Sequence, residues 1–184
     1  MKRLMLFAAM VMMMAVAAQA KTNPLRVKSG TLKPLKSGGG TIEVVFDFSK
    51  TRGNRKPLEQ HLQEDFNSSM EEFRENEPEM RKWFCERWND DIEKGPKIGQ
   101  GDGTTYQMTI VIKNLQMGAI SGFGGASISG YAEVFRRGES EPFAVIEILK
   151  LSGTQLGTAI AGYPGLHQAF NDLAEYMCDL IYHY

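Results

Sequence analysis

Cysteine is scarce in this chain of 184 residues, which contains two, Cys85 and Cys178. Their separation excludes a CxxC redox motif and a zinc knuckle, both of which need closely spaced thiols. The three histidines, His61, His167 and His183, show no ligand spacing with them. The sequence therefore predicts no metal ion and no cofactor. Two alternatives stay open for the thiols: a disulfide between Cys85 and Cys178, or two separately buried side chains.

An excess of charge of one sign is also absent. The chain has 21 basic and 22 acidic residues, a formal net charge of −1, with both signs interspersed along the sequence. Binding to nucleic acid or to an anionic lipid surface normally requires a concentrated basic footprint. The composition therefore predicts that nucleic acid is not a partner.

Long apolar runs are limited to one, at residues 4–18, which follows two basic residues. As a helix it would extend about 22 Å, at roughly 1.5 Å per residue, against a hydrocarbon core of about 30 Å. A small-x-small pattern at residues 18–20 completes the features of a secretory signal peptide. We therefore expect residues 1–20 to be removed, leaving a periplasmic or secreted protein without a transmembrane segment. A lipoprotein would need cysteine at position 21, where this chain has Lys21.

Recognisable catalytic motifs are lacking. The glycine-rich residues 99–103 precede a predicted strand, whereas a phosphate loop must open a helix. Residues 125–130 are one position out of register for a nucleophile elbow. Glu43 and Asp47 share one face of a predicted strand, which is typical of a solvent-facing surface. The sequence therefore predicts no catalytic residue.

What the sequence does contain is clear periodicity. Residues 21–40, rich in Lys, Pro, Ser and Gly, predict a flexible lead-in with at most one short strand at residues 25–28. Beyond it, alternation of apolar and polar residues predicts four strands. These strands are expected over residues 41–48, 104–115, 127–136 and 143–151.

Helical periodicity predicts three helices. The first begins at Pro57 and reaches Phe73, the second begins at Pro78 and ends at Gly95, and the last covers residues 166–184. The tryptophans of the second helix are read either as core residues or as anchors for a partner. The order of elements predicts one α+β domain over residues 41–184, a two-layer sandwich with a mainly antiparallel sheet of about four strands and helices on one face.

A glycine-rich connection at residues 118–125 is the candidate contact loop. Its marked residues are Gly118, Phe123, Gly124 and Gly125. Glycine permits a bulge, a tight hairpin or a backbone surface open to a ligand. Phe123 at its centre either docks into a partner or folds back onto the core.

The mature chain resembles a family of uncharacterised exported proteins of anaerobic Gram-negative bacteria. The segments that carry the resemblance are residues 27–32, 44–49, 106–111 and 166–181, with Trp83, Trp88 and Gly118. The resemblance implies export and the α+β class, and it implies no activity. The order of elements is also remotely similar to periplasmic envelope-assembly domains such as the curli-secretion lipoprotein, by fold analogy alone.

These observations favour an exported non-catalytic binding or envelope-accessory domain, whose partner is an unknown protein or envelope component. The contact surface would be the candidate contact loop or one face of the sheet. One alternative is a small secreted hydrolase acting on envelope or dietary polymers. Another is a structural subunit of a homo-oligomer assembled through Val45, Tyr131 and Phe135. The sequence does not determine the oligomeric state.

Overall fold

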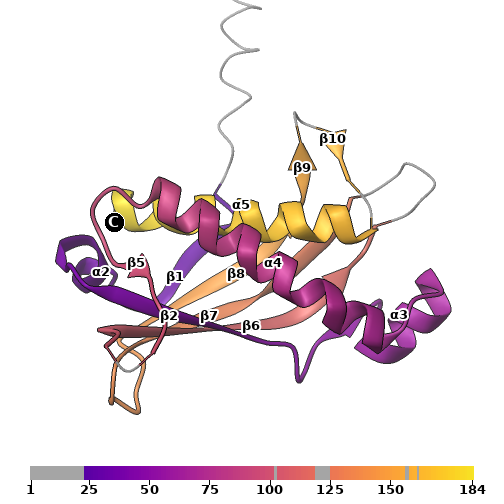
Figure 1. The fold of residues 1–184 in the computed structure, drawn as a ribbon, viewed down its shortest axis with the longest axis horizontal. Coiled ribbons are helices and arrows are strands. Elements are labelled where there is room, and N and C mark those ends of the chain that lie inside the picture. Colours follow the sequence, from indigo (N-terminus) through magenta and orange to yellow (C-terminus); the bar gives the residue numbers. More distant parts are fainter. Residues whose placement is uncertain (1–22, 102, 119–124, 156–157, 161) are drawn as a thin grey trace, which may run out of the picture.

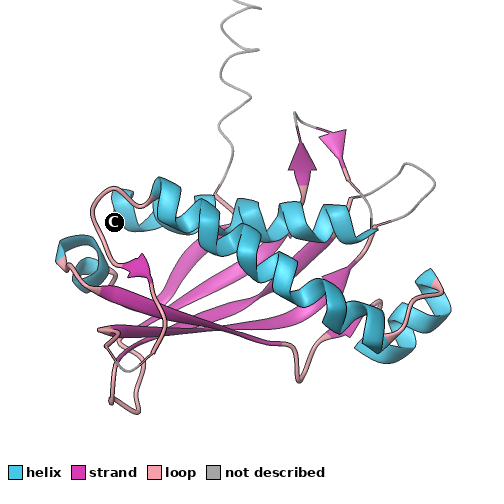
Figure 2. Cartoon of the chain, viewed as in Figure 1, coloured by secondary structure: helices cyan, strands magenta, loops and turns pink. Residues whose placement is uncertain are grey.

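The structure, a computed structural model, describes residues 23–101, 103–118, 125–155, 158–160 and 162–184. The expected signal peptide therefore lies outside the described residues, as do Phe123 and Gly124 of the candidate contact loop. Two long helices lie side by side across one face of a twisted sheet (Figures 1 and 2). The helices α4 and α5 thus form one layer and the sheet the other, which confirms the α+β class.

The elements follow one another as strands, then helices, then strands again. In chain order they are β1 (Leu25–Gly30), α2 (Lys33–Ser37), β2 (Thr41–Asp47), β3 (Arg52–Gly53), β4 (Lys56–Pro57), α3 (Leu58–Phe66), α4 (Met70–Asp91), β5 (Lys97–Ile98), β6 (Tyr106–Gln116), β7 (Ser127–Arg136), β8 (Ala144–Ser152), β9 (Thr154–Gln155), β10 (Thr158–Ala159) and α5 (Gly162–His183). Within the part of the chain that the structure describes, no helix combines the length and apolar character needed to cross a bilayer.

The main sheet is mixed, which corrects the expectation of a mainly antiparallel sheet of about four strands. Its eight strands include a central path in the order β1-β8-β7-β6-β2-β5, with β3 and β4 joined beside it. β1, β8, β7 and β6 pair antiparallel, whereas β2 runs parallel to both β6 and β5. The cause is the connection through α3 and α4, because a helical crossover returns the chain in the same direction.

The ordered fold begins earlier than the predicted boundary at residue 41. β1 pairs along β8 at the edge of the sheet, and Leu25 at its start is buried. Leu32 and Leu35, beside and within α2, are fully buried as well. Their burial ties the segment expected to be a flexible lead-in onto the core, because each leucine removes apolar surface from water.

The break between the first two helices lies nine residues before Pro78, the predicted start of the second. Asn67 adopts a left-handed conformation that ends α3, and Ser69 caps the start of α4. The Ser69 hydroxyl accepts a hydrogen bond from the backbone N–H of Glu72 at 3.1 Å. This serine and glutamate have the spacing of a capping box, in which the cap side chain satisfies a backbone N–H that has no partner within the helix. Pro78 lies inside α4.

Aromatic side chains join the two layers. Phe46 of β2 meets Phe84 of α4 and Phe170 of α5 edge to face, with ring centroids 5.3 and 5.1 Å apart. Trp88 is fully buried, and its indole N–H donates to the carbonyl of Pro96 at 2.9 Å. Trp88 is therefore a core residue. Trp83 is half-buried and donates to Glu79 at 3.1 Å.

Candidate functional site

The sheet face opposite α4 and α5 is left uncovered by the described residues (Figure 2). Strand alternation sends every second side chain to this face, hereafter the open face. In β2, β6, β7 and β8 most of these side chains are half-buried, while their neighbours on the other face are buried. The open face carries Glu43, Val45, Asp47, Gln107, Thr109, Val111, Tyr131, Glu133, Phe135, Val145 and Glu147.

Three β-bulges interrupt the ladder of neighbouring strands in one region of this sheet. Lys28 is the extra residue of β1 against β8, and Lys113 is the extra residue of β6 against β7. The pair Leu149 and Lys150 stands in β8 against the single Ser129 of β7. A bulge re-aims side chains and increases local twist, and bulges are frequent near binding sites. The bulges therefore interrupt regular pairing between each neighbouring pair among the strands β1, β8, β7 and β6.

Two adjoining hollows lie along these bulges, with volumes of about 220 and 210 Å³. They share Asn114, Ser129 and Leu149, so they form one depression, hereafter the bulge trough. Asn114 donates a side-chain hydrogen bond to the Ser129 hydroxyl at 3.1 Å. Leu149 is 49% exposed, one of the few large apolar side chains that reach solvent to this extent. The trough thus combines a polar floor with an apolar contact point.

Positive charge surrounds the bulge trough. Lys28 and Lys113 line its first hollow and Lys150 its second. The ammonium of Lys113 lies 4.9 Å from the centroid of the Tyr131 ring, a cation–π distance. The one acid of the trough, Glu147, pairs with Arg26 at 2.5 Å. Since no ion pair of Lys28 or Lys150 occurs among the described residues, the trough presents unneutralised positive charge.

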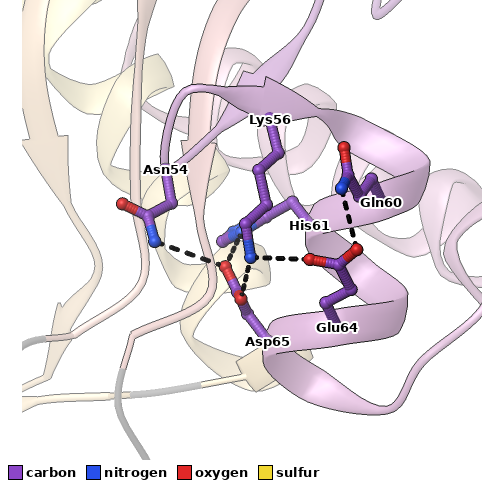
Figure 3. A network of polar contacts seen from close by, with 6 residues as sticks. All are labelled: Asn54, Lys56, Gln60, His61, Glu64 and Asp65. Carbon is purple, nitrogen blue, oxygen red and sulfur yellow. Dashed lines mark hydrogen bonds and ion pairs between the residues drawn. The ribbon is translucent and has the colours of Figure 1, made fainter.

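A second polar cluster joins α3 to the β3–β4 hairpin (Figure 3). Asp65 accepts from the Lys56 ammonium at 2.6 Å and contacts Nδ1 of His61 at 2.7 Å. The hydrogen bond from Lys56, followed by that from His61, lowers the pKa of Asp65 from 3.8 to about 2. Lys56 also pairs with Glu64 at 3.0 Å. The bond to Asp65, followed by the bond to Glu64, raises the pKa of Lys56.

This Asp65–His61 pair has the composition of a general base, but it is closed to substrates. His61 is 1% exposed, and its Nε2 atom is buried without a hydrogen-bond partner. A Cβ added at Gly53 would lie 1.9 Å from the imidazole, so the hairpin backbone covers the ring closely. Asn54 and Arg55 at the hairpin tip both have positive φ, as a tight two-residue hairpin requires. The cluster therefore fixes a hairpin to a helix.

A hollow of about 560 Å³ lies between the C-terminal ends of α4 and α5. Arg87 crosses it, pairing with Asp91 at 2.6 Å and with Glu175 at 2.9 Å. Asp90 and Asp179 add further carboxylates to its wall. Within the described part of the chain, no three metal-ligating side chains are grouped so that they hold a metal ion.

Both thiols are free in the structure, so the disulfide between Cys85 and Cys178 is not supported. Cys178 is buried with its Sγ 3.8 Å from the carbonyl of Trp88, one turn further along α4 than Cys85. A helical wheel shows which side of a helix a residue occupies, but not which residue of a neighbouring helix it packs against. The offset between Cys178 and Cys85 is set by how α5 packs along α4. Burial raises the pKa of Cys178 to about 12, and burial also raises the pKa of the half-buried Cys85.

Only the two ends of the candidate contact loop are described. Gly118 has a φ of 78°, a conformation that favours glycine, and Gly125 is half-buried.

The sequence analysis did not predict the bulge trough. One sequence feature could have indicated it: Gly130 lies within a predicted strand. An isolated glycine in a strand indicates a bulge or a close backbone approach. A Cβ at Gly130 would lie 2.0 Å from the carbonyl oxygen of Val111.

Comparison with known proteins gives no family. No protein-family model matches the chain, and no curated protein matches it. Among solved structures, two of the PelC dodecamer from Paraburkholderia phytofirmans are similar in outline, one of them a point variant. They are 10% and 9% identical to this chain, cover 83% of it and 95% of their own chain, and each gives a TM-score of 0.43. A likeness of this strength carries no inference about fold or function.

Proposed function

We propose that this protein is a non-catalytic binding domain that contacts a macromolecular partner through the open face of its sheet. The observation that carries the proposal is the contrast between the two faces. One is covered by α4 and α5, while the other presents half-buried aromatic and β-branched side chains to solvent. Uncovered sheet faces of this kind mark interaction surfaces when apolar side chains are grouped on them.

The composition of the open face supports binding to a macromolecule. Tyr131 and Phe135 lie on β7. Val145 lies on the neighbouring strand β8, and Val45 lies on β2, beyond β6 on the other side. Aromatic side chains are enriched in the cores of protein interfaces, and charged residues are typical of their rims. Glu43, which pairs with Arg137 at 2.8 Å, provides such a polar border.

Export is the second part of the proposal. Residues 1–20 have the charge, apolar core and cleavage pattern of a signal peptide, so the partner would be a periplasmic, secreted or envelope component. The intact mass of protein recovered from fractionated cells tests this part. We expect a mature chain that begins at Lys21, and protein that retains Met1 in the cytoplasmic fraction would contradict export.

The test of the open face uses matched tyrosine substitutions. Tyr131 lies on the open face, whereas Tyr182 is 57% exposed near the end of α5. A photo-crosslinking group at position 145 should capture a partner in intact cells. We expect Tyr131→Ser to reduce the captured product at least several-fold, while Tyr182→Ser leaves its yield unchanged.

Thermal unfolding of the two variants separates binding from folding. Both should melt within a few degrees of the original protein, because neither tyrosine is buried in the core. Equal capture by both variants, with equal stability, would remove the open face as the binding surface. A substrate turned over by the purified domain would instead favour the hydrolase alternative.

A further inference from the structure

Charge is unevenly divided between the two layers of the molecule. The helices α3, α4 and α5 contain 14 acidic and 4 basic residues. The other described residues contain 14 basic and 7 acidic ones. The chain is nearly neutral overall, but its charges are separated in the folded protein. The helix layer is acidic, and the sheet with its loops is more basic. Such a division creates a long-range field that orients charged partners during encounter.

The acids of α4 are arranged in a line along the helix. Glu71, Glu75, Glu79, Glu86 and Asp90 recur at intervals of four or seven residues, hence on one side of the helix. Four of the five are exposed, and Glu79 is half-buried. Lys82 lies within the same line and pairs with Glu79 at 3.3 Å. Among the described residues, the unpaired negative charge of this acidic stripe therefore lies toward its two ends, at Glu71 and Glu75 and at Glu86 and Asp90.

The bulge trough carries the opposite charge on the opposite side of the molecule. Its lysines come from different strands: Lys28 from β1, Lys150 from β8 and Lys113 from β6. Strand β7 lies between β8 and β6, so the three lysines are spread across four strands. The trough belongs to the sheet layer and the stripe to the helix layer, so the two surfaces point away from each other in one copy.

We propose that the bulge trough binds the acidic stripe of a second copy of this chain. The inference rests on the proposed function, since it assigns a partner to the open face. The lysines of the trough and the carboxylates of the stripe have opposite charge, which favours this occupant. The stripe also lies on a helix that every copy presents. Leu149, exposed between the two hollows, supplies an apolar contact beside the ion pairs.

The contact joins two different surfaces, so each copy in a pair still has one trough and one stripe free. Such head-to-tail contacts continue beyond two copies unless rotation closes the assembly. The purified mature protein should thus show a mass that increases with concentration. Because exposed charges are screened over about 10 Å at 0.1 M salt and about 3 Å at 1 M, the association should be strong at low salt and lost at high salt.

A charge exchange between two variants tests the contact directly. The trough variant carries Lys113→Glu with Lys150→Glu, and the stripe variant carries Glu86→Lys with Asp90→Lys. Lys33→Glu with Lys36→Glu, on exposed lysines of α2, is the matched control for the change in net charge. Sedimentation velocity of each purified variant, alone and mixed, gives the readout at about 20 mM and about 500 mM sodium chloride.

We expect the original protein and the α2 control to associate at low salt. The trough and stripe variants should each sediment as monomers alone. Mixed, they should form a complex, because the stripe variant keeps an unaltered trough, the trough variant keeps an unaltered stripe, and the two reversed surfaces are complementary as well. Monomers at every concentration, association that survives high salt, or association unaffected by both variants would each overturn the proposal. Melting curves confirm that the variants are folded, because all four substituted side chains are exposed.

Failure of this proposal is distinguishable from failure of the proposed function. If the purified protein is monomeric while Tyr131→Ser still abolishes capture in cells, the open face binds a different partner and only self-docking is wrong. If capture is also insensitive to Tyr131→Ser, the open face itself is excluded.

Discussion

The two faces of one sheet differ although the same strands build both. On the covered face, Val44, Phe46, Met108 and Ile110 are nearly or fully buried beneath α4 and α5. On the open face, their immediate neighbours, such as Val45 and Thr109, stay half-buried among charged residues. Residues adjacent in sequence therefore have different roles, because alternation sends one into the core and the next to solvent. Stability should depend on the covered face and binding on the open face.

The largest expected effect is the loss of a core aromatic ring. Phe46→Ala removes the ring that contacts Phe84 and Phe170, and such truncations cost about 3–5 kcal/mol. Val45→Ala, one residue away on the open face, should cost less than about 1 kcal/mol, since its side chain is already partly hydrated. Chemical denaturation of the two variants measures both values. Similar losses for both would mean that the open face is covered in the native protein.

Gly130→Ala sharpens the comparison, because it tests the close approach of β7 to β6 at the bulge trough. The added methyl group would meet the carbonyl oxygen of Val111, and overpacking of this kind costs about 1–3 kcal/mol. Gly138→Ala is not a suitable control, since its φ of 85° strains any other residue. Gly39→Ala, with nothing within 4 Å of the added carbon, is the appropriate control. Equal stability of Gly130→Ala and Gly39→Ala would contradict the close strand approach at the bulge trough.

The stability of the helix layer that covers the sheet depends on how α4 is capped at its N-terminus. Ser69→Ala removes the N-cap hydrogen bond to Glu72 and should destabilise the protein by about 1 kcal/mol. Ser69→Asp keeps an acceptor at the same position and should retain most of the stability. Thermal unfolding at neutral pH compares the two. A helix that truly started at Pro78 would make both substitutions neutral.

The Asp65 cluster should give a smaller, pH-dependent effect. The pKa of Asp65 in the folded protein is about 2, below its ordinary value of 3.8, so its contribution is complete above about pH 4 and is lost as the pH falls toward 2. Asp65→Asn should therefore lower the melting temperature at pH 6 and have little effect at pH 2. Gln63→Ala, at an exposed position of α3 that does not belong to the network in Figure 3, is the control. A deficit that is constant with pH would show that the charge of Asp65 is not involved.

The smallest expected effect is at Cys85. Cys85→Ser should change the stability by less than about 1 kcal/mol under non-reducing conditions, because the thiol is free and half-buried. Loss of a native disulfide would cost about 2–5 kcal/mol. Thiol titration of the unfolded protein should also detect two free groups. A large loss of stability seen only under non-reducing conditions would instead indicate that Cys85 and Cys178 form a disulfide.

The sequence predicted most elements because their periodicity is local. Strands at residues 41–48, 104–115, 127–136 and 143–151 correspond to β2, β6, β7 and β8 within two residues at either end. The one short strand allowed at residues 25–28 corresponds to β1. Helix α2 lies in the segment expected to be a flexible lead-in, because five residues carry too little helical periodicity to predict a helix. The capping box at Ser69 was present in the sequence, but proline was weighted above it in placing the second helix.

The candidate site was only partly accessible to sequence reasoning. Val45, Tyr131 and Phe135 were placed correctly on one sheet face, since alternation alone determines which residues share a face. The bulge trough was missed because a bulge is defined by pairing between strands. Lys28, Lys113 and Lys150 are far apart in the chain, and only the register of four strands brings them together.

By itself, then, the sequence determined the α+β class and the apolar sides of the long helices, both of which depend on residues within a few turns of one another. The export signal is a prediction from a local pattern of the same kind. The tertiary structure decided the parallel pairing of β2 with β6, the separation of Cys85 from Cys178 and the basic trough opposite an acidic helix. The physical reason is that strand register and helix offset depend on how segments distant in sequence pack against one another. A local sequence pattern describes only one of the surfaces that pack together.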